Sequence, residues 1–377
     1  MAGYLGCPAS GDDTIVEVRR LDRFTPTGTP ISPPQLDGYF RLQGVERVNY
    51  VRTYNAWGPF TVDLGGGSFC QNILQLIEPG WWEVRILRGR DVAYSGVIYE
   101  ISQTSGQQSA QLTGGDMASI FAEDGGRLIN LMDMQFTDVD PVDAAAEVIR
   151  YAFGWITPPD GYLMSDYLYT NPIGETIDYA PGVTADYVLD TLDDFTEFGL
   201  LYAAVGRRII LAQPATLANR PVATLTTAHF DGPVRLVKSS LDMGVLGVAV
   251  GEDDDGNTQV TTYGDTGSRW GTPSIRVDVE RGVSARSRAT AARRAIQGKT
   301  RPLYRVDMPT SARLLPTAPI SLNNLRPGSA RVDMEVHDIP VPVRQPAMLT
   351  EVEFEWRGGR EDIKATLAPI GAPVAIP

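Results

Sequence analysis

Cysteine and histidine are both scarce in this chain of 377 residues. The two cysteines, Cys7 and Cys70, can form at most one disulfide, so a disulfide framework is not what holds the fold together. The two histidines, His229 and His337, are too few for a three-histidine zinc site, and neither lies in a His-Glu-x-x-His motif. The sequence therefore predicts no metal site.

Long hydrophobic runs are also absent. No apolar stretch approaches the ~18–20 residues that a helix needs to span a bilayer, so we expect no membrane insertion by this chain. The first residues contain no basic segment followed by an apolar stretch, so we expect no secretory signal there. Hydrophobic residues still make up 43% of the chain, which is enough to build a core and excludes global disorder. The length suggests about two to four domains.

Positive charge is limited and concentrated in one segment. The chain has 33 basic and 46 acidic residues, a net charge of -13 with both histidines neutral. An acidic chain without a basic tail is a poor sequence-independent DNA binder, because affinity for phosphates depends on clustered cations. Residues 281–305 nevertheless hold seven arginines and one lysine without any acid, a charge of +8 that leaves -21 on the rest of the chain.

Two interpretations of the segment 281–305 remain open. It can be the solvated face of a helix, as most runs of charge are. It can also be a subunit interface, in which guanidinium groups meet the acidic surface of a neighbouring copy. The arginines of this candidate interface are Arg286, Arg288, Arg293 and Arg294.

Short motifs that resemble catalytic or ligand-binding signatures are incomplete. The glycine-rich segment 65–70 lacks the lysine of a phosphate loop, and Cys70 stands where a dinucleotide fingerprint or a nucleophile elbow needs glycine. The acid run 252–257 does not fit an EF-hand, because placing Gly256 at position 6 puts Gly251 at position 1. We read that run as a hairpin tip. The sequence therefore predicts no enzyme and no cofactor.

Alternation of apolar and polar residues predicts a β-rich part over residues 1–124. A strand is expected at Thr14–Arg20, and residues 81–87 and 92–101 are expected to form a hairpin. A proline-rich loop follows the first strand, because proline lacks the amide donor that a central strand needs. Further strands are expected at 39–42, 47–54, 60–64 and 110–113.

The period changes to that of helices in residues 125–213, which predicts an α/β middle domain. Asp140 is expected to cap a helix over 141–153, and Thr184 a second helix over 185–198. A hairpin is expected at 200–205 and 208–212. The intervening stretch 156–181 is rich in proline, glycine and tyrosine, and we interpret it as a loop or an elaborated surface.

Strand patterns return in the last two parts of the chain. Residues 214–310 predict a hairpin at 245–250 and 258–263, followed by a basic helix at 284–297. Residues 311–377 predict closing strands at 330–337, 348–356 and 362–367.

One of these closing strands has two chemically different faces. Period two places Glu351, Glu353 and Glu355 on one face, and three apolar side chains on the other. Like charges repel, so we expect the acidic face to be well hydrated. It is either an ordinary solvent-facing strand or the wall of a water-filled channel that carries an anion without binding it.

The order of these elements resembles that of phage tail hub proteins. The strand pair at 81–87 and 94–101 is similar to the strand pair of this family, and so is the segment 112–120 with its Asp-led turn. The two helices, their hairpin and the closing strands follow in the family's usual order. The chain also looks like minor tail proteins of siphophages that infect actinobacteria, which is consistent with GC-rich coding, because only three of the basic residues are lysines.

The resemblance implies a mainly β (α+β) fold, with two tube-like β-barrel domains and an intervening helical α/β part. Such hubs are homotrimers at the tail tip of the virion, where a pseudo-sixfold ring matches the hexameric tail tube. The implied partners are the distal tail protein, the tape measure protein and the central fibre proteins of the same virion, with DNA only in transit. Many relatives continue into a cell-wall hydrolase, and because the sequence ends at Pro377 we expect no lytic role.

The implied role suggests a function for the acidic strand face and for the basic segment 281–305. A structural hub that continues or closes the tail channel, and anchors the central fibre for DNA ejection, needs a wall that does not bind phosphate. We expect Glu351, Glu353 and Glu355 to line the lumen, and the arginines of 281–305 to pack against neighbouring chains.

Two other functions remain open. One is a distal tail protein or a receptor-binding tail protein that uses surface tyrosines. The other is a cell-wall hydrolase with an unrecognised pair of acids. The surface tyrosines of the receptor-binding alternative are Tyr162, Tyr167, Tyr169 and Tyr179.

Overall fold

A computed structural model gives the fold of the chain. It describes all residues except 1–13, 21–38, 66–73, 90, 104–108, 124–127, 130–133, 156–167, 180–185, 207, 213–219, 234, 242, 254, 280, 301, 308–312, 316, 321–327, 329, 338–341, 371–373 and 376–377. Several predictions fall outside the described residues: those on Cys7, Cys70, Thr184, Tyr162, Tyr167, the proline-rich loop and most of the glycine-rich segment.

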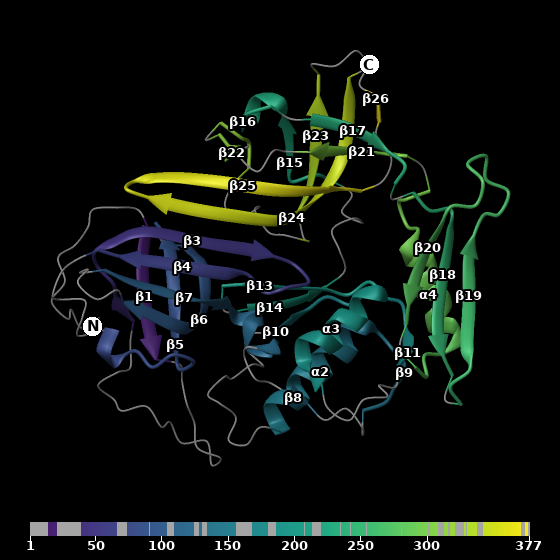
Figure 1. The fold of residues 1–377 in the computed structure, drawn as a ribbon, viewed down its shortest axis with the longest axis horizontal. Coiled ribbons are helices and arrows are strands. Elements are labelled where there is room, and N and C mark those ends of the chain that lie inside the picture. The colour runs from purple at the N-terminus through teal and green to yellow at the C-terminus, as the bar shows by residue number, and fades with distance from the viewer. Residues whose placement is uncertain are drawn as a thin grey trace.

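A 12-stranded sheet joins the two ends of the sequence (Figure 1). Its order is β15-β23-β24-β3-β4-β7-β6-β5-β1-β2, and β25 and β26 also pair with β24. The bounds are β1 Thr14–Arg20, β2 Phe40–Arg41, β3 Val45–Thr53, β4 Pro59–Leu64, β5 Trp82–Arg88, β6 Asp91–Gln103, β7 Ala110–Asp116, β15 Ala223–Thr226, β23 Arg331–Val336, β24 Val343–Arg357, β25 Arg360–Pro369 and β26 Val374–Ala375. Strands are the main secondary structure, so the fold is mainly β, as predicted. Within the described residues no sheet closes on itself into a barrel.

Alternating burial explains why these segments form strands. Val16 and Val18 are buried in β1 while their neighbours are half-buried, which is the pattern of a strand with one face on a core. The predicted hairpin at 81–87 and 92–101 is confirmed by the antiparallel pair β5 and β6. The long hairpin of β24 and β25, yellow in Figure 1, lies along β3, so β3 joins segments from opposite ends of the sequence.

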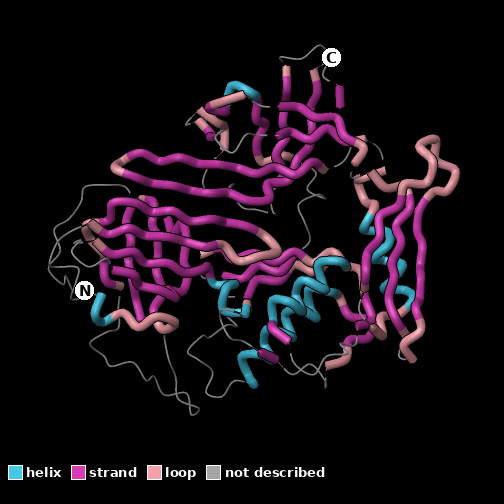
Figure 2. Tube along the Cα trace, viewed as in Figure 1, coloured by secondary structure: helices cyan, strands magenta, loops and turns pink. Residues whose placement is uncertain are grey.

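The middle of the chain forms a second core around two helices. The bounds are η2 Met117–Phe121, β8 Leu128–Ile129, β9 Phe136–Val139, α2 Pro141–Trp155, β10 Leu168–Thr170, β11 Ile177–Tyr179, β12 Asp186–Tyr187, α3 Val188–Glu197, β13 Leu201–Val205 and β14 Arg208–Ala212. Asp140 caps α2 as predicted, because its Oδ1 accepts a hydrogen bond from the Val142 amide at 2.9 Å. Figure 2 shows α2 and α3 close together beside the β13–β14 hairpin.

Two predictions for this region are wrong in part. The stretch 156–181 is not all loop, because β10 pairs in parallel with β14, and β11 pairs with β9. Strands of three residues are too short for alternation to reveal. The second helix begins at Val188 rather than at residue 185, because Asp186 and Tyr187 pair with β8 instead.

The remaining elements include a separate sheet of three strands, covered by a helix. The bounds are η6 Thr227–His229, β16 Phe230–Asp231, β17 Arg235–Ser239, β18 Leu246–Glu252, β19 Thr258–Gly264, β20 Ser274–Asp278, α4 Ala285–Ala295, β21 Leu303–Asp307 and β22 Arg313–Leu314. The predicted hairpin and basic helix are confirmed as β18, β19 and α4.

Small residues let α4 lie close to the sheet. Gly247 of β18 faces the helix so closely that an added Cβ would come within 1.8 Å of the Ala292 carbonyl oxygen. Ala249 and Ala292 are fully buried at the same contact. None of the helices that the structure describes combines the length and the hydrophobicity needed to cross a membrane.

Candidate functional site

The predicted acidic face of β24 lies on the polar side of the large sheet. Glu353 is held from both neighbouring strands: Lys364 Nζ of β25 donates to its Oε2 at 2.8 Å, and Asn49 Nδ2 of β3 donates to its Oε1 at 2.8 Å. Burial raises the pKa of Glu353, but the hydrogen bonds from Lys364 and Asn49 outweigh it, so the pKa lies below its usual value. Glu351 is exposed.

Glu355 belongs to a polar row that continues across the sheet. Arg47 Nε donates to Glu355 Oε1 at 2.8 Å, and its guanidinium also lies 3.8 Å from Asp63 of β4. Gln111 of β7 then donates to Asp63 at 2.8 Å. Cations and amides are therefore interleaved with the carboxylates, so this face is less negative than the three glutamates alone indicate.

The opposite face of β24 is apolar, as the alternation predicts. Val352 and Phe354 are fully buried, and the Phe354 ring stacks on Tyr50 with centroids 4.7 Å apart. Arg52 is buried nearby, and its guanidinium carbon lies 5.4 Å from the centre of the Phe354 ring. The strand therefore has the two-faced character that the sequence indicates.

Three of the four arginines of the candidate interface contact acids of the same chain. Arg293 and Arg294 both reach Glu175 Oε2, at 2.6 and 3.1 Å. Arg286 lies 3.1 Å from Asp138, whose pKa is lowered by a hydrogen bond from Thr176 and by the charge of Arg286.

The fourth arginine and the helix itself are also held within the chain. Arg288 donates to Thr261 Oγ1 at 3.3 Å and to the Val283 carbonyl. Ser287 of α4 accepts a hydrogen bond from the Asp178 amide at 2.9 Å and donates one to the Asp178 carbonyl at 3.1 Å. Helix α4 is therefore fastened to the segment 168–179, which belongs to the stretch that the sequence predicts to be a loop or an elaborated surface.

A junction between the large sheet and the middle core was missed by sequence reasoning. The Asn55 amide donates to the Tyr202 carbonyl at 2.8 Å, and the Tyr202 amide donates to Asn55 Oδ1 at 3.1 Å. The Tyr202 hydroxyl donates to Asp193 Oδ1 at 2.5 Å, and burial raises the pKa of Tyr202. Asn55 has a φ of 51°, which asparagine tolerates better than most residues, so the Asn-Ala-Trp-Gly turn was the available signal.

Asp116 is the most perturbed carboxyl near this junction. It accepts hydrogen bonds from the amides of Gly58 and Ala118, at 2.8 and 2.9 Å, and burial raises its pKa to about 7 although both amides lower it. A pKa near 7 suits general acid–base catalysis. Asp116 is only 3% exposed, however, and backbone donors occupy both oxygens, so its role here is to cap η2 and fix the adjoining turn.

Among the described residues, no three His, Cys, Asp or Glu side chains come together in a way that could hold a metal ion. Except for the exposed Glu351, the carboxylates described above are held by donors of the same chain, so the arrangement supports sheet pairing and domain contacts.

Comparison with known proteins identifies the fold. No protein-family model matches the chain, and no curated protein matches it. A tail protein from Neisseria meningitidis superimposes with a TM-score of 0.56 at 12% identity, over 94% of this chain and 96% of that one. The fold is that of phage tail proteins.

Two further tail proteins share this fold over nearly their whole length. Prophage tail protein gp18 from Listeria monocytogenes has a TM-score of 0.54 and 10% identity, over 93% of this chain and 94% of that one. The 43 kDa tail protein of prophage MuSo2 from Shewanella oneidensis has a TM-score of 0.53 and 11% identity, over 96% and 99%. At such low identity the likeness concerns the tail-protein fold alone.

Proposed function

We propose that this chain is a structural hub protein of a phage tail tip. The observation that carries the proposal is the tail-protein fold, which extends over almost the full length of the chain and of three tail proteins. The resemblance in element order to siphophage minor tail proteins of actinobacteriophages supports the same assignment. In this role the chain is part of the virion and has no enzymatic activity.

The proposed assembly is a homotrimer that forms a ring below the tail tube. Two tube-like domains per chain, one over 1–124 and a second completed by the strands of 311–377, would give the ring its pseudo-sixfold symmetry. The parts at 125–213 and 214–310 would narrow the channel and hold the central fibre. Its neighbours would be the distal tail protein, the tape measure protein and the fibre proteins.

The charge pattern supports a conduit for DNA. A channel wall releases DNA when it carries no uncompensated cations, because clustered cations bind phosphates strongly. The polar face with Glu351, Glu353 and Glu355 approaches this condition, since Arg47 and Lys364 are neutralised there by carboxylates. We assign this face to the lumen.

The arginines of α4 differ in how much surface they leave free for contact with a neighbouring copy. Arg294 is 14% exposed and held by Glu175, so it stabilises the contact within the chain. Arg286 and Arg293 are 64% and 42% exposed and keep surface for a neighbouring copy. The subunit contact would therefore involve these two more than Arg294 or Arg288.

A low-resolution map of the virion tail tip tests the proposal. The expected result is three copies of this chain in a threefold ring at the end of the tube, with the β24 face toward the axis. A sixfold ring indicates a distal tail protein instead, and absence from the virion overturns the proposal. A cell-wall digestion assay with the isolated chain tests the hydrolase alternative, and we expect no clearing.

A further inference from the structure

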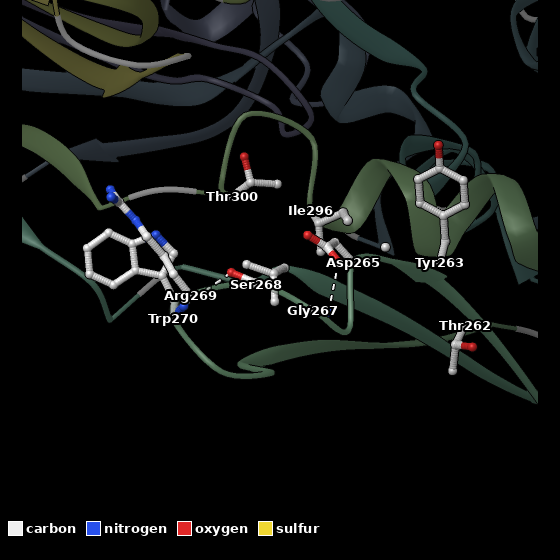
Figure 3. Close-up of a pocket in the computed structure, with 11 residues that line it drawn as sticks. Thr262, Tyr263, Asp265, Gly267, Ser268, Arg269, Trp270, Ile296 and Thr300 are labelled. Carbon is white, nitrogen blue, oxygen red and sulfur yellow. Dashed lines mark hydrogen bonds between the residues drawn. The ribbon is translucent and has the colours of Figure 1, made fainter.

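An open cleft lies at one end of the sheet of β18, β19 and β20 (Figure 3). One wall is the loop between β19 and β20, and the other is the segment that follows α4. The cleft has a volume of about 1210 Å³. Val245 and Ile296 lie beneath it in the interior, where they are 3% and 5% exposed.

Backbone hydrogen bonds fix both walls to the same short segment. The Gly244 amide donates to the Lys299 carbonyl at 3.1 Å, which holds the wall after α4. The Val245 amide donates to the Pro273 carbonyl at 2.9 Å, and the Asp265 amide donates to the Val245 carbonyl at 3.1 Å, which hold the loop wall. The cleft is therefore formed before any ligand arrives, and a preformed site loses less conformational entropy on binding.

The loop wall is also ordered by its own side chains. The Gly267 amide donates to Asp265 Oδ1 at 2.8 Å, and the Trp270 amide donates to Ser268 Oγ at 3.3 Å. Both are local turns that position the residues between them. Gly264, with a φ of 139°, brings the chain so close to Val245 that a Cβ would lie 2.0 Å from its carbonyl oxygen.

Two large aromatic side chains stand exposed in this cleft. Tyr263 is 48% exposed and Trp270 is 43% exposed. The Arg269 guanidinium carbon lies 4.6 Å from the centre of the Trp270 ring, which restricts the indole (Figure 3). Ordered aromatic rings at the surface offer apolar contact area at a low entropy cost.

The polar groups of the cleft suit hydroxyls better than ions. Asp265 and Arg269 provide one charge of each sign, and Ser268 and Thr300 provide hydroxyls. Within the described part of the chain, the Tyr263 hydroxyl, the Thr300 hydroxyl and the Trp270 indole N–H make no hydrogen bond, so they remain able to bind a ligand.

We propose that this cleft binds a neutral oligosaccharide. A sugar ring has apolar C–H faces that pack on aromatic rings, and hydroxyls around its rim that bind carboxylate, guanidinium and hydroxyl groups. The balanced charge disfavours polyanions. The open shape disfavours a small apolar ligand, which needs an enclosed pocket. The volume accommodates several sugar rings.

This site does not depend on the role proposed above for the chain. The cleft lies on β18–β20 and the end of α4, away from the β24 face assigned to the channel. A threefold ring without sugar binding would overturn the cleft proposal alone. Sugar binding by a chain that is absent from the tail tip would overturn the hub proposal alone.

Fluorine NMR of the full chain labelled with 5-fluorotryptophan tests the cleft. The chain has six tryptophans, and Trp270→Phe identifies the signal of Trp270. The probes are maltotetraose, cellotetraose and chitotetraose, with tetragalacturonate as the charged comparison. We expect at least one neutral tetrasaccharide to shift the Trp270 signal saturably at millimolar concentration and to leave the other five signals in place.

Variants connect the shift to the cleft. Tyr263→Ala is expected to weaken binding by about threefold to tenfold, because it removes one aromatic contact. Val260→Ala is the control on the same strand, since Val260 is 59% exposed on β19 and does not line the cleft; it should leave binding unchanged. Circular dichroism of each variant checks that the fold is kept.

Four results would overturn the saccharide proposal. They are no saturable shift with any neutral tetrasaccharide, unchanged affinity in folded Tyr263→Ala, tighter binding of tetragalacturonate than of the neutral probes, and a Trp270 signal that responds to another virion protein but to no saccharide.

Discussion

Arg47 and Glu355 are joined by a hydrogen bond of 2.8 Å although they lie 308 positions apart in the sequence. The bond crosses from β3 to β24 and adds to the backbone pairing of these strands. It therefore marks the place where the first and last parts of the chain become one sheet.

The contribution of this ion pair to stability should be small. The two side chains are 39% and 23% exposed, and water and salt screen such pairs. A double-mutant cycle with Arg47→Ala and Glu355→Ala should give a coupling free energy below about 1 kcal/mol. The coupling should fall further in high salt. A coupling well above this range that does not respond to salt would contradict the argument.

Phe354 on the other face of β24 should matter much more. It is fully buried and stacks on Tyr50, so Phe354→Ala should cost about 3–5 kcal/mol. Hydrogen exchange of the β3 and β24 amides in increasing denaturant measures this loss of unfolding free energy in the two strands concerned. Tyr169→Ala, at a residue that is 55% exposed, should change stability by less than about 0.5 kcal/mol.

Two glycines with similar backbone angles separate steric contact from backbone strain. Gly199 has a φ of 93°, and an added Cβ would lie 2.3 Å from the Arg294 guanidinium; Gly174 has a φ of 81°, with no atom within 4 Å. Each Gly→Ala substitution should lower the free energy of unfolding by about 1–2 kcal/mol, because alanine is strained in the left-handed conformation. Gly199→Ala should lower the melting temperature more, because it also displaces Arg294 from Glu175. Equal losses in the two variants would mean that this contact contributes nothing.

The buried Asp116 should make stability depend on pH. Its pKa is raised from 3.8 to about 7 in the folded chain, so between these values the folded chain keeps a proton that the unfolded chain has lost. Stability should therefore fall as pH rises through this interval, by at most roughly 1.4 kcal/mol per pH unit, and level off above it.

Asp116→Asn tests this dependence, because an amide does not titrate. Melting temperatures of both chains across the interval should show the wild-type chain losing stability relative to the variant as pH rises. A constant difference between the two chains at every pH would contradict the assignment.

Local signals explain what could be predicted from the sequence. The β5–β6 and β18–β19 hairpins each depend on residues close in the chain, and Asp140 caps its helix through the next turn. The pairing of β3 with β24 could not be predicted, because alternation shows that a strand exists but not which distant strand it meets.

The candidate site shows the same limit. The two faces of β24 followed from period two, but the partners of Glu353 come from other strands, and one of them is more than 300 positions away. The Glu175 contact was missed because its segment contains only three-residue strands. The cleft was missed because its walls meet only when the end of α4 returns to β18.

The pairing of β3 with β24 has a consequence for synthesis. Until β24 emerges, β3 is the outer strand of the sheet that the first residues build, and nearly 300 residues separate the two strands. At ~5–20 residues per second the ribosome needs about 15–60 seconds to supply the missing strand. During that time β3 is an open edge in a crowded cell, and the charge of Arg47 and the polar side chain of Asn49 disfavour its pairing with the same edge on another nascent chain.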